Sequence, residues 1–347
     1  MSIGGGTGLA QLLSGLKRFV APPVRAMDPS EELIERLLPP ISDLTAVVTV
    51  TDDGGSSGRL RDEFQILPPG DIRKCLVALS EDEHLMARLF QYRFEGAGEL
   101  QGHSFGNLFL TALTNVTGDF LEAIRLSSEV LAIQGRILPS TTDDIRLVAE
   151  LENGASLYGE SLIGRSPVAI RRIGISPASC SPLLETLQAI RQADVITLGP
   201  GSLYTSLLPN LLVPEILSAL QSSTACRIYI SNIMTQPGET FGFRNSDHLA
   251  AIEQHCDGFP FDYVLCNLAP VSVGQARAYA EDNAVQVEND VESLKSFGTR
   301  VVMKDLLADD EKVRHDPLKV SLAILEIAAQ CSSVEMLQRL DRLVETS

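Results

Sequence analysis

Residues 194–232, DVITLGPGSLYTSLLPNLLVPEILSALQSSTACRIYISN, decide the fold class. DVITLG (194–199) and CRIYISN (226–232) are short apolar runs, and VPEILSALQ (213–221) between them has helical spacing. The alternation continues on both sides, with helices expected at 182–193, 246–256, 274–283 and 291–297 and strands at 261–267, 285–288 and 299–305. Repeated strand–helix alternation predicts parallel strands wound right-handedly, with helices on both faces of the sheet.

The first half of the chain begins the same sheet with a strand, a glycine loop and a helix. MSI (1–3) precedes the glycines, and GLAQLLSGLKRF (8–19) is amphipathic. LTAVVTVT (44–51) predicts a second buried strand, and residues 20–43 a surface insertion with a short helix at 30–38. Because a strand before a glycine loop usually carries about four or more apolar residues, we expect the natural chain to begin earlier.

The middle of the chain departs from simple alternation. Gly and Pro residues predict an irregular polar loop over 52–71, and helices are then expected at 71–80, 83–94, 105–116 and 119–133. Two alternating segments within 145–163 meet at Asn153-Gly154, a tight-turn dipeptide, and with 168–175 they predict a small antiparallel patch. Two helices, 317–331 and 333–345, are expected to end the chain.

The predicted fold is one α/β domain over residues 1–347, a doubly wound, mainly parallel sheet with a helical segment and a small antiparallel β patch inserted. Its parts are an N-terminal glycine-loop half with the helical segment (1–135), the antiparallel insertion (136–181) and a C-terminal βα half (182–347).

Composition excludes several classes of protein. The net charge of −17 argues against a nucleic-acid surface, which relies on excess Lys and Arg. The six cysteines form no C-x-x-C pair and mostly lie in apolar runs, which favours buried thiols in a reducing cytosol over a zinc site. No apolar stretch approaches the roughly 18 residues needed to cross a bilayer, so we expect a cytoplasmic protein with no membrane span.

Small, polar and acidic residues follow the main predicted strands. In an open parallel sheet, ligands bind in the crevice beyond the carboxyl ends of the strands. The segments expected there are GGGTG (4–8), TDDGGSSG (51–58), GPGSLYTS (199–206), SNIMTQPGET (231–240) and CN (266–267).

The glycine loop GGGTG predicts a phosphate cradle, because its N–H groups and the following helix dipole favour an anion. Leu9 stands where a dinucleotide fingerprint needs glycine, and no Gly-Lys-Ser/Thr of a Walker loop follows, so the commonest modes of NAD and ATP binding are disfavoured. A tight turn without any ligand is the alternative.

Asp52 and Asp53 follow the second strand. Such a pair could hold Mg²⁺ on a diphosphate, orient a ribose or act as a base, or it could cap loop N–H groups. Farther along, Asp71 is expected to be the N-cap of its helix, and Arg73 to grip a phosphate or to be a solvated residue.

GHSFG (102–106) has the G-x-S-x-G spacing of a hydrolase nucleophile elbow. The polar glycine-rich residues before it are not the buried strand that an elbow needs, so a nucleophilic Ser104 is disfavoured. Ser104, with His103 and Asn107 nearby, is instead expected to cap a helix at the crevice, and a cap without a ligand is the alternative.

Long runs of the chain resemble the gluconeogenesis factor (YvcK) family, a branch of the CofD-like (2-phospho-L-lactate transferase) superfamily. They include IGGGTGL, TVTDDGGSSGRLR, LPPGDIRKCLVAL, GHSFGNL, ILPSTTDDIRLVAEL, LGPGSLYTSLLPNLLVPEI, SNIMTQPGET and VRHDP, and the match covers nearly the whole chain. The first strand is shorter than the family's, and residues 20–43 are longer than usual.

The resemblance implies a Rossmann-like fold, a cytoplasmic location, binding of UDP-sugars such as UDP-N-acetylglucosamine, and a role in cell shape and wall precursor balance on gluconeogenic carbon. No reaction is settled for this branch. The transferase relatives move a phospholactyl group from a guanylylated donor, with magnesium near acids at the positions matching Asp52 and Asp53.

Two functions follow as hypotheses. The first is a nucleotide-sugar-binding regulator, whose ligand-binding residues would be Gly4, Gly5, Gly6, Thr7, Gly8, Gly54, Gly55, Ser56, Asp71, Arg73, Ser104, Asn107, Gly199, Gly201, Ser202, Tyr204, Asn232, Thr235, Asn267 and Arg314. The second is a magnesium-dependent transferase, with Asp52 as metal ligand and Asp53 or His103 as base. Mg²⁺ is the one cofactor candidate, and the sequence leaves open a homo-oligomer.

Overall fold

The sheet that the alternation predicts is present in the computed structural model, which describes residues 1–20, 40–81 and 85–345, with side chains to residue 332. Its seven strands lie in the order β10-β9-β8-β7-β1-β2-β3, and every pairing is parallel. They are β1 (Ser2–Gly4), β2 (Thr45–Val48), β3 (Arg136–Pro139), β7 (Val195–Leu198), β8 (Cys226–Ile230), β9 (Tyr263–Asn267) and β10 (Arg300–Lys304). The Rossmann-like, mainly parallel α/β fold is confirmed.

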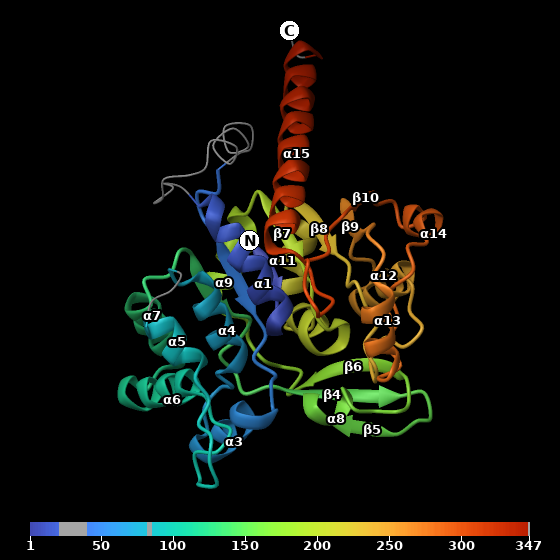
Figure 1. The fold of residues 1–347 in the computed structure, drawn as a ribbon. Coiled ribbons are helices and arrows are strands. Elements are labelled where there is room, and N and C mark those ends of the chain that lie inside the picture. Colours follow the sequence, from blue (N-terminus) through green and yellow to red (C-terminus); the bar gives the residue numbers. More distant parts are fainter. Residues whose placement is uncertain (21–39, 82–84, 346–347) are drawn as a thin grey trace.

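β-Branched and aliphatic residues make the central strands, because both faces of this sheet are covered by helices (Figure 1). Every residue of β2 and β9 is buried. The helices are α1 (Gly6–Leu16), the 3₁₀ turn η1 (Lys17–Phe19), α3 (Gly55–Phe64), α4 (Gly70–Leu79), α5 (Leu85–Gln91), α6 (Phe105–Thr117), α7 (Phe120–Val130), α9 (Leu184–Gln192), the π-helical turn η2 (Leu203–Leu207), α10 (Leu208–Leu211), α11 (Ile216–Ser222), α12 (Asn245–Cys256), α13 (Val273–Ala280), α14 (Val291–Lys295) and α15 (Pro317–Glu345).

A second sheet, of order β5-β4-β6, is antiparallel and confirms the predicted patch. β4 (Arg146–Leu151) and β5 (Ser156–Tyr158) form the hairpin at Asn153-Gly154, and β6 (Ile170–Ser176) pairs with the other edge of β4. Figure 1 shows this sheet on the side of the molecule opposite the projecting end of α15.

Several predicted elements are wrong. Residues 136–139 do not belong to the antiparallel insertion, since β3 pairs with β2 in the main sheet. Residues 160–163 form a helical turn, α8 (Glu160–Ile163), in place of the end of a strand. Residues 285–288 make only an isolated bridge, between Gln286 and Met234. A single helix, α15, replaces the two expected at the end, and α5 stops at Gln91. The helix expected at 30–38 lies outside the described residues.

The loop expected over 52–71 contains a ten-residue helix, α3. A Cβ at Gly58 would overlap the Asp53 carbonyl group, so this glycine allows the helix to pack closely against Asp53. The glycine content of the segment had suggested an irregular loop. Leu60 and Arg61 are buried on the same helix, and the Arg61 side chain donates to Asp144 and to the Ile145 carbonyl oxygen. Tertiary contacts therefore override the low helix propensity of glycine here.

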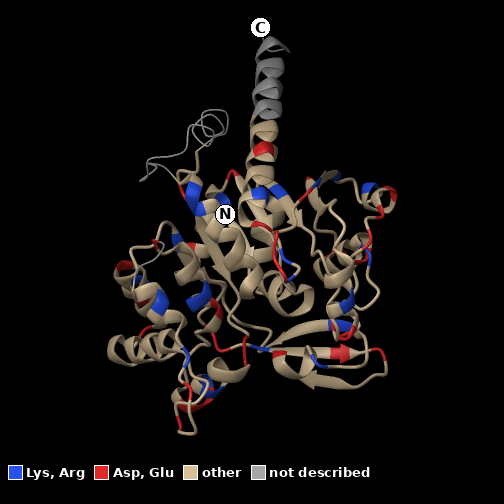
Figure 2. Cartoon of the chain, in the orientation of Figure 1, with Lys and Arg blue, Asp and Glu red and all other residues tan. Residues whose placement is uncertain are grey.

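Four cysteines are buried free thiols, as predicted, but Cys226 of β8 and Cys331 of α15 form a disulfide. Their separation of 105 residues gave no sequence signal for the pair. Charged residues of both signs are interspersed over the described part of the chain (Figure 2).

Among the described residues, no single helix is long and apolar enough to cross a membrane. One pair bent by 77°, Leu203–Leu211 with Ile216–Ser222, meets the length and composition criteria together.

Candidate functional site

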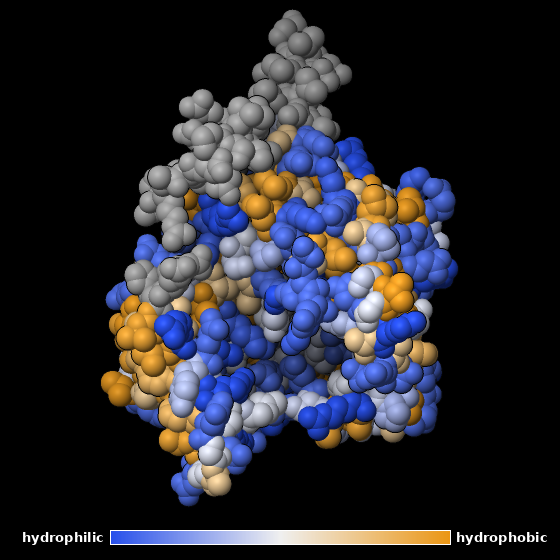
Figure 3. All heavy atoms as spheres, in the orientation of Figure 1, coloured by the Kyte–Doolittle hydropathy of each residue, from blue (hydrophilic) through white to orange (hydrophobic). Residues whose placement is uncertain are grey.

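The strand order reverses between β1 and β7, which marks the topological switch point of the sheet. The loops that leave these two strands are in contact: a Cβ at Gly8 would overlap the Pro200 carbonyl oxygen, and one at Gly201 would lie 3.7 Å from the Gly5 oxygen. The fold thus brings the predicted segments 4–8 and 199–202 together. Figure 3 shows a hollow lined largely by hydrophilic residues near the centre of the face of the molecule that is in view.

Asp71 reaches the glycine loop from α4. Its Oδ2 accepts a hydrogen bond from the Gly6 N–H (2.7 Å), and its Oδ1 accepts one from Lys74 Nζ (2.9 Å). A Cβ at Gly5 would lie 2.8 Å from Asp71 Oδ2, so this approach requires glycine. Asp71 is not the N-cap expected, because α4 begins one residue earlier and Pro69 is its N-cap. Thr7 is exposed in the first turn of α1.

Asp52 faces the same place from the end of β2. Its Oδ1 accepts from the Gly54 N–H (2.9 Å), and Ser57 donates to its carboxylate. Burial, followed by the charge of Asp71, raises the pKa of Asp52, whereas the Gly54 and Ser57 hydrogen bonds oppose the rise.

Asp53 points away from its neighbour. Its Oδ1 accepts from the Ser161 N–H (2.8 Å) in the first turn of α8, and its Oδ2 lies against Gly159. This contact fits the loop-capping interpretation of Asp53, and it separates the two carboxylates that the sequence placed side by side.

Two further carboxylates, Glu160 and Glu239, lie in this region and were missed. Glu160 Oε2 is buried without a hydrogen-bond partner, and burial together with the charges of Asp71, Asp52, Glu239 and Asp53 raises its pKa well above the usual value. The sequence placed Glu160 in a strand, so it did not predict that this residue begins the helical turn α8 beside the site.

Glu239 closes the loop after β7. It accepts from the Tyr204 N–H (3.1 Å) and the Thr205 hydroxyl (3.0 Å), and burial raises its pKa. It lies within SNIMTQPGET, a segment that was singled out without this residue.

Carboxylates therefore gather at the switch point, and such oxygen ligands suit Mg²⁺. Within residues 1–20, 40–81 and 85–345, no group of three or more His, Cys, Asp or Glu side chains is arranged to hold a metal ion. The magnesium assigned to Asp52 stays a prediction.

Ser104 is the helix cap that the sequence predicts. Its Oγ accepts from the Asn107 N–H (3.2 Å) at the start of α6. The Asn107 side chain then donates to Ser56 Oγ (3.1 Å), and Ser56 Oγ lies 3.0 Å from His103 Nδ1. Burial and the charge of Arg59 lower the pKa of His103. Ser56 of α3 and His103 are thus brought together from 47 positions apart.

Arg73 is buried beside the first turn of α6. A Cβ at Gly106 would lie 2.8 Å from Arg73 Cδ, and Arg73 Nη1 is 3.4 Å from the Phe90 carbonyl oxygen. Its Nε is buried without a hydrogen-bond partner, and burial lowers its pKa. Arg73 is therefore not the solvated residue that was the alternative.

Asn232 shapes the loop after β7. Its Oδ1 accepts from the Gly201 N–H (3.1 Å), and its Nδ2 donates to the Gly201 carbonyl oxygen (2.8 Å). Gln236 Nε2 donates to Ser202 Oγ (2.7 Å), and Gly199 has a φ of +88°, which favours glycine. These contacts hold the second half of the predicted cradle.

Four predicted ligand residues have protein partners in the structure. Tyr204 is buried with its ring against Phe243 and His255. Thr235 exchanges hydrogen bonds with the Val285 main chain. The other two, Asn267 and Arg314, bond to the Leu306 N–H and to Asp310 respectively.

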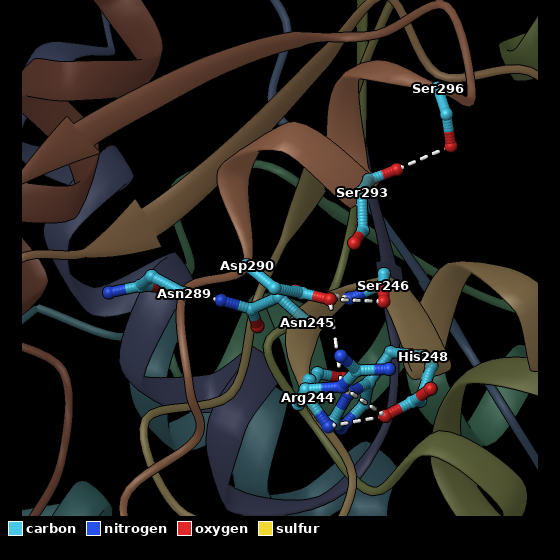
Figure 4. A network of polar contacts seen from close by, with 9 residues as sticks. Arg244, Asn245, Ser246, His248, Asn289, Asp290, Ser293 and Ser296 are labelled. Carbon is cyan, nitrogen blue, oxygen red and sulfur yellow. Dashed lines mark hydrogen bonds and ion pairs between the residues drawn. The ribbon is translucent and has the colours of Figure 1, made fainter.

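A polar network holds the loops after β8 and β9 (Figure 4). Asn245 Nδ2 donates to Asn289 Oδ1 (2.6 Å), and Asn289 Nδ2 donates to the Asn267 carbonyl oxygen (2.8 Å). Asp290 accepts from the Ser246 N–H (3.0 Å) and hydroxyl, and its Oδ2 lies 3.7 Å from Arg244 Nε. The network fixes the start of α12 to the carboxyl ends of the strands.

A separate cavity of about 380 Å³ lies at the amino ends of β1, β2 and β7, lined among others by Asp43, Thr45, Asp194 and Leu325. It is on the opposite edge of the sheet from the residues described above. Ligands of open parallel sheets bind beyond the carboxyl ends of the strands, where the candidate site lies, so this cavity is not part of the site.

The fold and the site define a Rossmann-like α/β protein with a glycine-lined, carboxylate-rich crevice at its switch point. The family model described as "2-phospho-L-lactate transferase CofD" matches residues 1–307. A gluconeogenesis factor of Halalkalibacterium halodurans is 47% identical over 331 residues, 95% of this chain and 96% of the relative. A gluconeogenesis factor of Bacillus subtilis is 43% identical over 325 residues, 93% of this chain and 96% of the relative.

A putative gluconeogenesis factor of Nostoc is 46% identical over 93% of this chain and 67% of its own length. A crystal structure of a Bacillus halodurans protein, 47% identical, superposes with a TM-score of 0.85 over 93% of this chain and 98% of that chain. The chain belongs to the gluconeogenesis factor (YvcK) family within the CofD superfamily, which confirms the resemblance carried by its motifs.

Proposed function

We propose that this chain is a cytoplasmic nucleotide-sugar-binding regulator, with UDP-N-acetylglucosamine as the candidate ligand, that acts on cell shape and wall precursor balance during gluconeogenic growth. The observation that carries the proposal is the contact between the glycine loops after β1 and β7 at the switch point. Glycines that admit a close backbone approach, together with the amino end of α1, suit the diphosphate of such a ligand.

Asp71 limits how a diphosphate can bind to the glycine loop. Its carboxylate accepts from the Gly6 N–H, where an anion would bind, and Lys74 pairs with it. A diphosphate has to share this place with a carboxylate, so it needs a compensating cation or a shifted Asp71.

Isothermal titration with UDP-N-acetylglucosamine, with and without magnesium, tests the proposal. We expect saturable heat with the UDP-sugar and weaker heat with UMP or free N-acetylglucosamine, because neither carries the sugar diphosphate. The absence of heat with any UDP-sugar at millimolar concentration would refute this function.

A magnesium-dependent transferase acting on a nucleotide-activated donor is the second candidate. It is favoured by the carboxyl groups of Asp52 and Glu160 in the crevice, where burial first and the charge of Asp71 second raise their pKa values and make their negative charges unfavourable. Such charge has a use if a cation binds with the substrate. The name of the family model is consistent with this chemistry.

The variant Asp52→Asn separates the two functions, and Asp62→Asn is its matched control, since Asp62 pairs with Arg146 at the surface. If the chain is a transferase, Asp52→Asn loses a magnesium-dependent product while it binds the ligand without magnesium at least as well as wild type. Asp62→Asn retains the product. Equal products from Asp52→Asn and wild type would exclude the metal role of Asp52.

A further inference from the structure

Ser56 and Ser57 are neighbours in the first turn of α3, and Asn107 Nδ2 lies within hydrogen-bond distance of both hydroxyl oxygens, at 3.1 Å from Ser56 Oγ and 3.5 Å from Ser57 Oγ. Ser57 donates to the Asp52 carboxylate. Ser56 Oγ lies 3.0 Å from His103 Nδ1 and accepts a hydrogen bond from Asn107 Nδ2 (3.1 Å). Only Ser56 has an imidazole within hydrogen-bond distance.

The Asn107 amide determines the direction of the serine hydroxyl. Because Ser56 Oγ accepts from Asn107 Nδ2, its own proton is free to point to His103 Nδ1, which then accepts with its lone pair. Burial, helped by Arg59 and opposed by Glu63, lowers the pKa of His103, which favours the neutral imidazole. A neutral imidazole in this orientation is ready to take the serine proton.

The amino end of α3 lies beside Ser56, and the Asp52 carboxylate accepts hydrogen bonds at the same end, from the Gly54 N–H and from Ser57. α3 has ten residues, and its N-cap, Gly54, supplies no side-chain hydrogen bond to the first turn. Its amino end therefore offers N–H groups and a positive dipole end beside the Ser56 oxygen. The buried Arg73, whose Nε lacks a hydrogen-bond partner, packs on Gly106 next to Asn107.

We propose that Ser56 is a nucleophile toward phosphorus in phosphoric esters and anhydrides, with His103 as its base and Asn107 as a positioning residue. In the step, a bond forms between Ser56 Oγ and phosphorus while the bond from phosphorus to the leaving group breaks. The leaving group departs with the electron pair, and the hydroxyl proton moves to His103 Nδ1. This activity goes beyond the proposed binding function, which needs no serine–histidine pair.

A fluorophosphonate probe tests the proposal on the full chain, because its phosphorus–fluorine bond breaks in the same kind of step and releases fluoride. Peptide mass spectrometry of the wild-type protein locates the adduct without any variant. We expect one adduct, on Ser56. His103→Gln should slow labelling by about 10²-fold or more, as loss of a general base does. Ser128→Ala, which removes a hydroxyl that donates to the Ile124 carbonyl oxygen within α7, should label within a few-fold of wild type.

Three results would each overturn the proposal: no adduct, an adduct on Ser104 or any residue other than Ser56, or labelling of His103→Gln at the wild-type rate. Titration of UDP-N-acetylglucosamine into the His103→Gln variant keeps this test apart from the proposed function, because His103 is not among the expected ligand-binding residues. A variant that labels slowly and still binds the sugar nucleotide supports both. Loss of ligand heat in the wild-type chain refutes the binding function alone.

Discussion

Glu160 places a carboxyl oxygen in the interior of the candidate site. Its Oε2 is buried without a partner, and burial and neighbouring carboxylates, led by Asp71, raise its pKa. The folded chain therefore holds this proton more tightly than the unfolded chain, so stability falls as pH rises from the ordinary glutamate pKa to the raised one. Glu160→Gln should be more stable than wild type at pH 8 and lose part of the pH dependence in urea unfolding. Glu150→Gln, on the surface, is the control; equal curves for Glu160→Gln and wild type would contradict the raised pKa.

Gly8 lies where the loops after β1 and β7 are too close for a side chain. A Cβ there would overlap the Pro200 carbonyl oxygen, so Gly8→Ala must push apart the loops after β1 and β7. Overpacking of this kind costs about 1–3 kcal/mol of unfolding free energy, and denaturant unfolding should show it. Gly98→Ala is the matched control, since a Cβ at Gly98 meets no atom within 4 Å. If both variants have wild-type stability, the loops are not in contact.

At the scale of elements, α3 is held to the β3–β4 connection by a buried arginine. Arg61 is 2% exposed and bonds Asp144 and the Ile145 carbonyl oxygen, whereas Arg146 pairs with Asp62 at the surface. Arg61→Ala leaves that carbonyl unsatisfied, so we expect a loss of about 2–3 kcal/mol of unfolding free energy. Arg146→Ala should lose less than about 1 kcal/mol in the same denaturant series. Equal losses would mean that the Arg61 contacts are no stronger than a surface pair.

The same helix marks where sequence reasoning stops. Strands such as β7 and β9 were predictable because continuous apolar runs have one stable environment, a sheet covered on both faces. α3 was not, because its glycines favour a loop locally and only distant partners, Asp144 and Ile145, stabilise the helix. Sequence therefore predicts an element whose own residues indicate its environment, and it misses one that depends on contacts with particular distant residues.

At the scale of the whole molecule, sequence predicted that the loops after the main strands gather in one crevice and that Ser104 caps α6, but it missed other side-chain contacts there. The carboxyl ends of parallel strands lie at the same end of the sheet, so segments 4–8 and 199–202 were expected in one crevice, and the adjacency of β1 and β7 brings them together. The turn of Asp53 toward Ser161 and the pairing of Ser56 with His103 depend on the placement of α8 and α3, which sequence did not give.

Buried histidines join distant parts of the chain and set its response to acid. His255 Nε2 accepts from the Ile173 N–H (2.9 Å), which links α12 to β6, and His315 bonds to Ser231. Burial lowers the pKa of His248 and His255, and it lowers that of His315 to about 4. As pH falls, each of these histidines is protonated at a higher pH in the unfolded chain than in the folded chain.

His315 should therefore contribute stability that is complete above about pH 6.5 and is lost as pH falls toward 4. The loss from this group alone is about 3 kcal/mol at pH 4, while Glu160 and Glu239, with raised pKa values, act in the opposite direction. For that reason, the informative quantity is the difference between variants. In urea unfolding from pH 7.5 to 4.5, wild type should lose about 2 kcal/mol more than His315→Gln, and parallel curves would show that His315 does not titrate in this range.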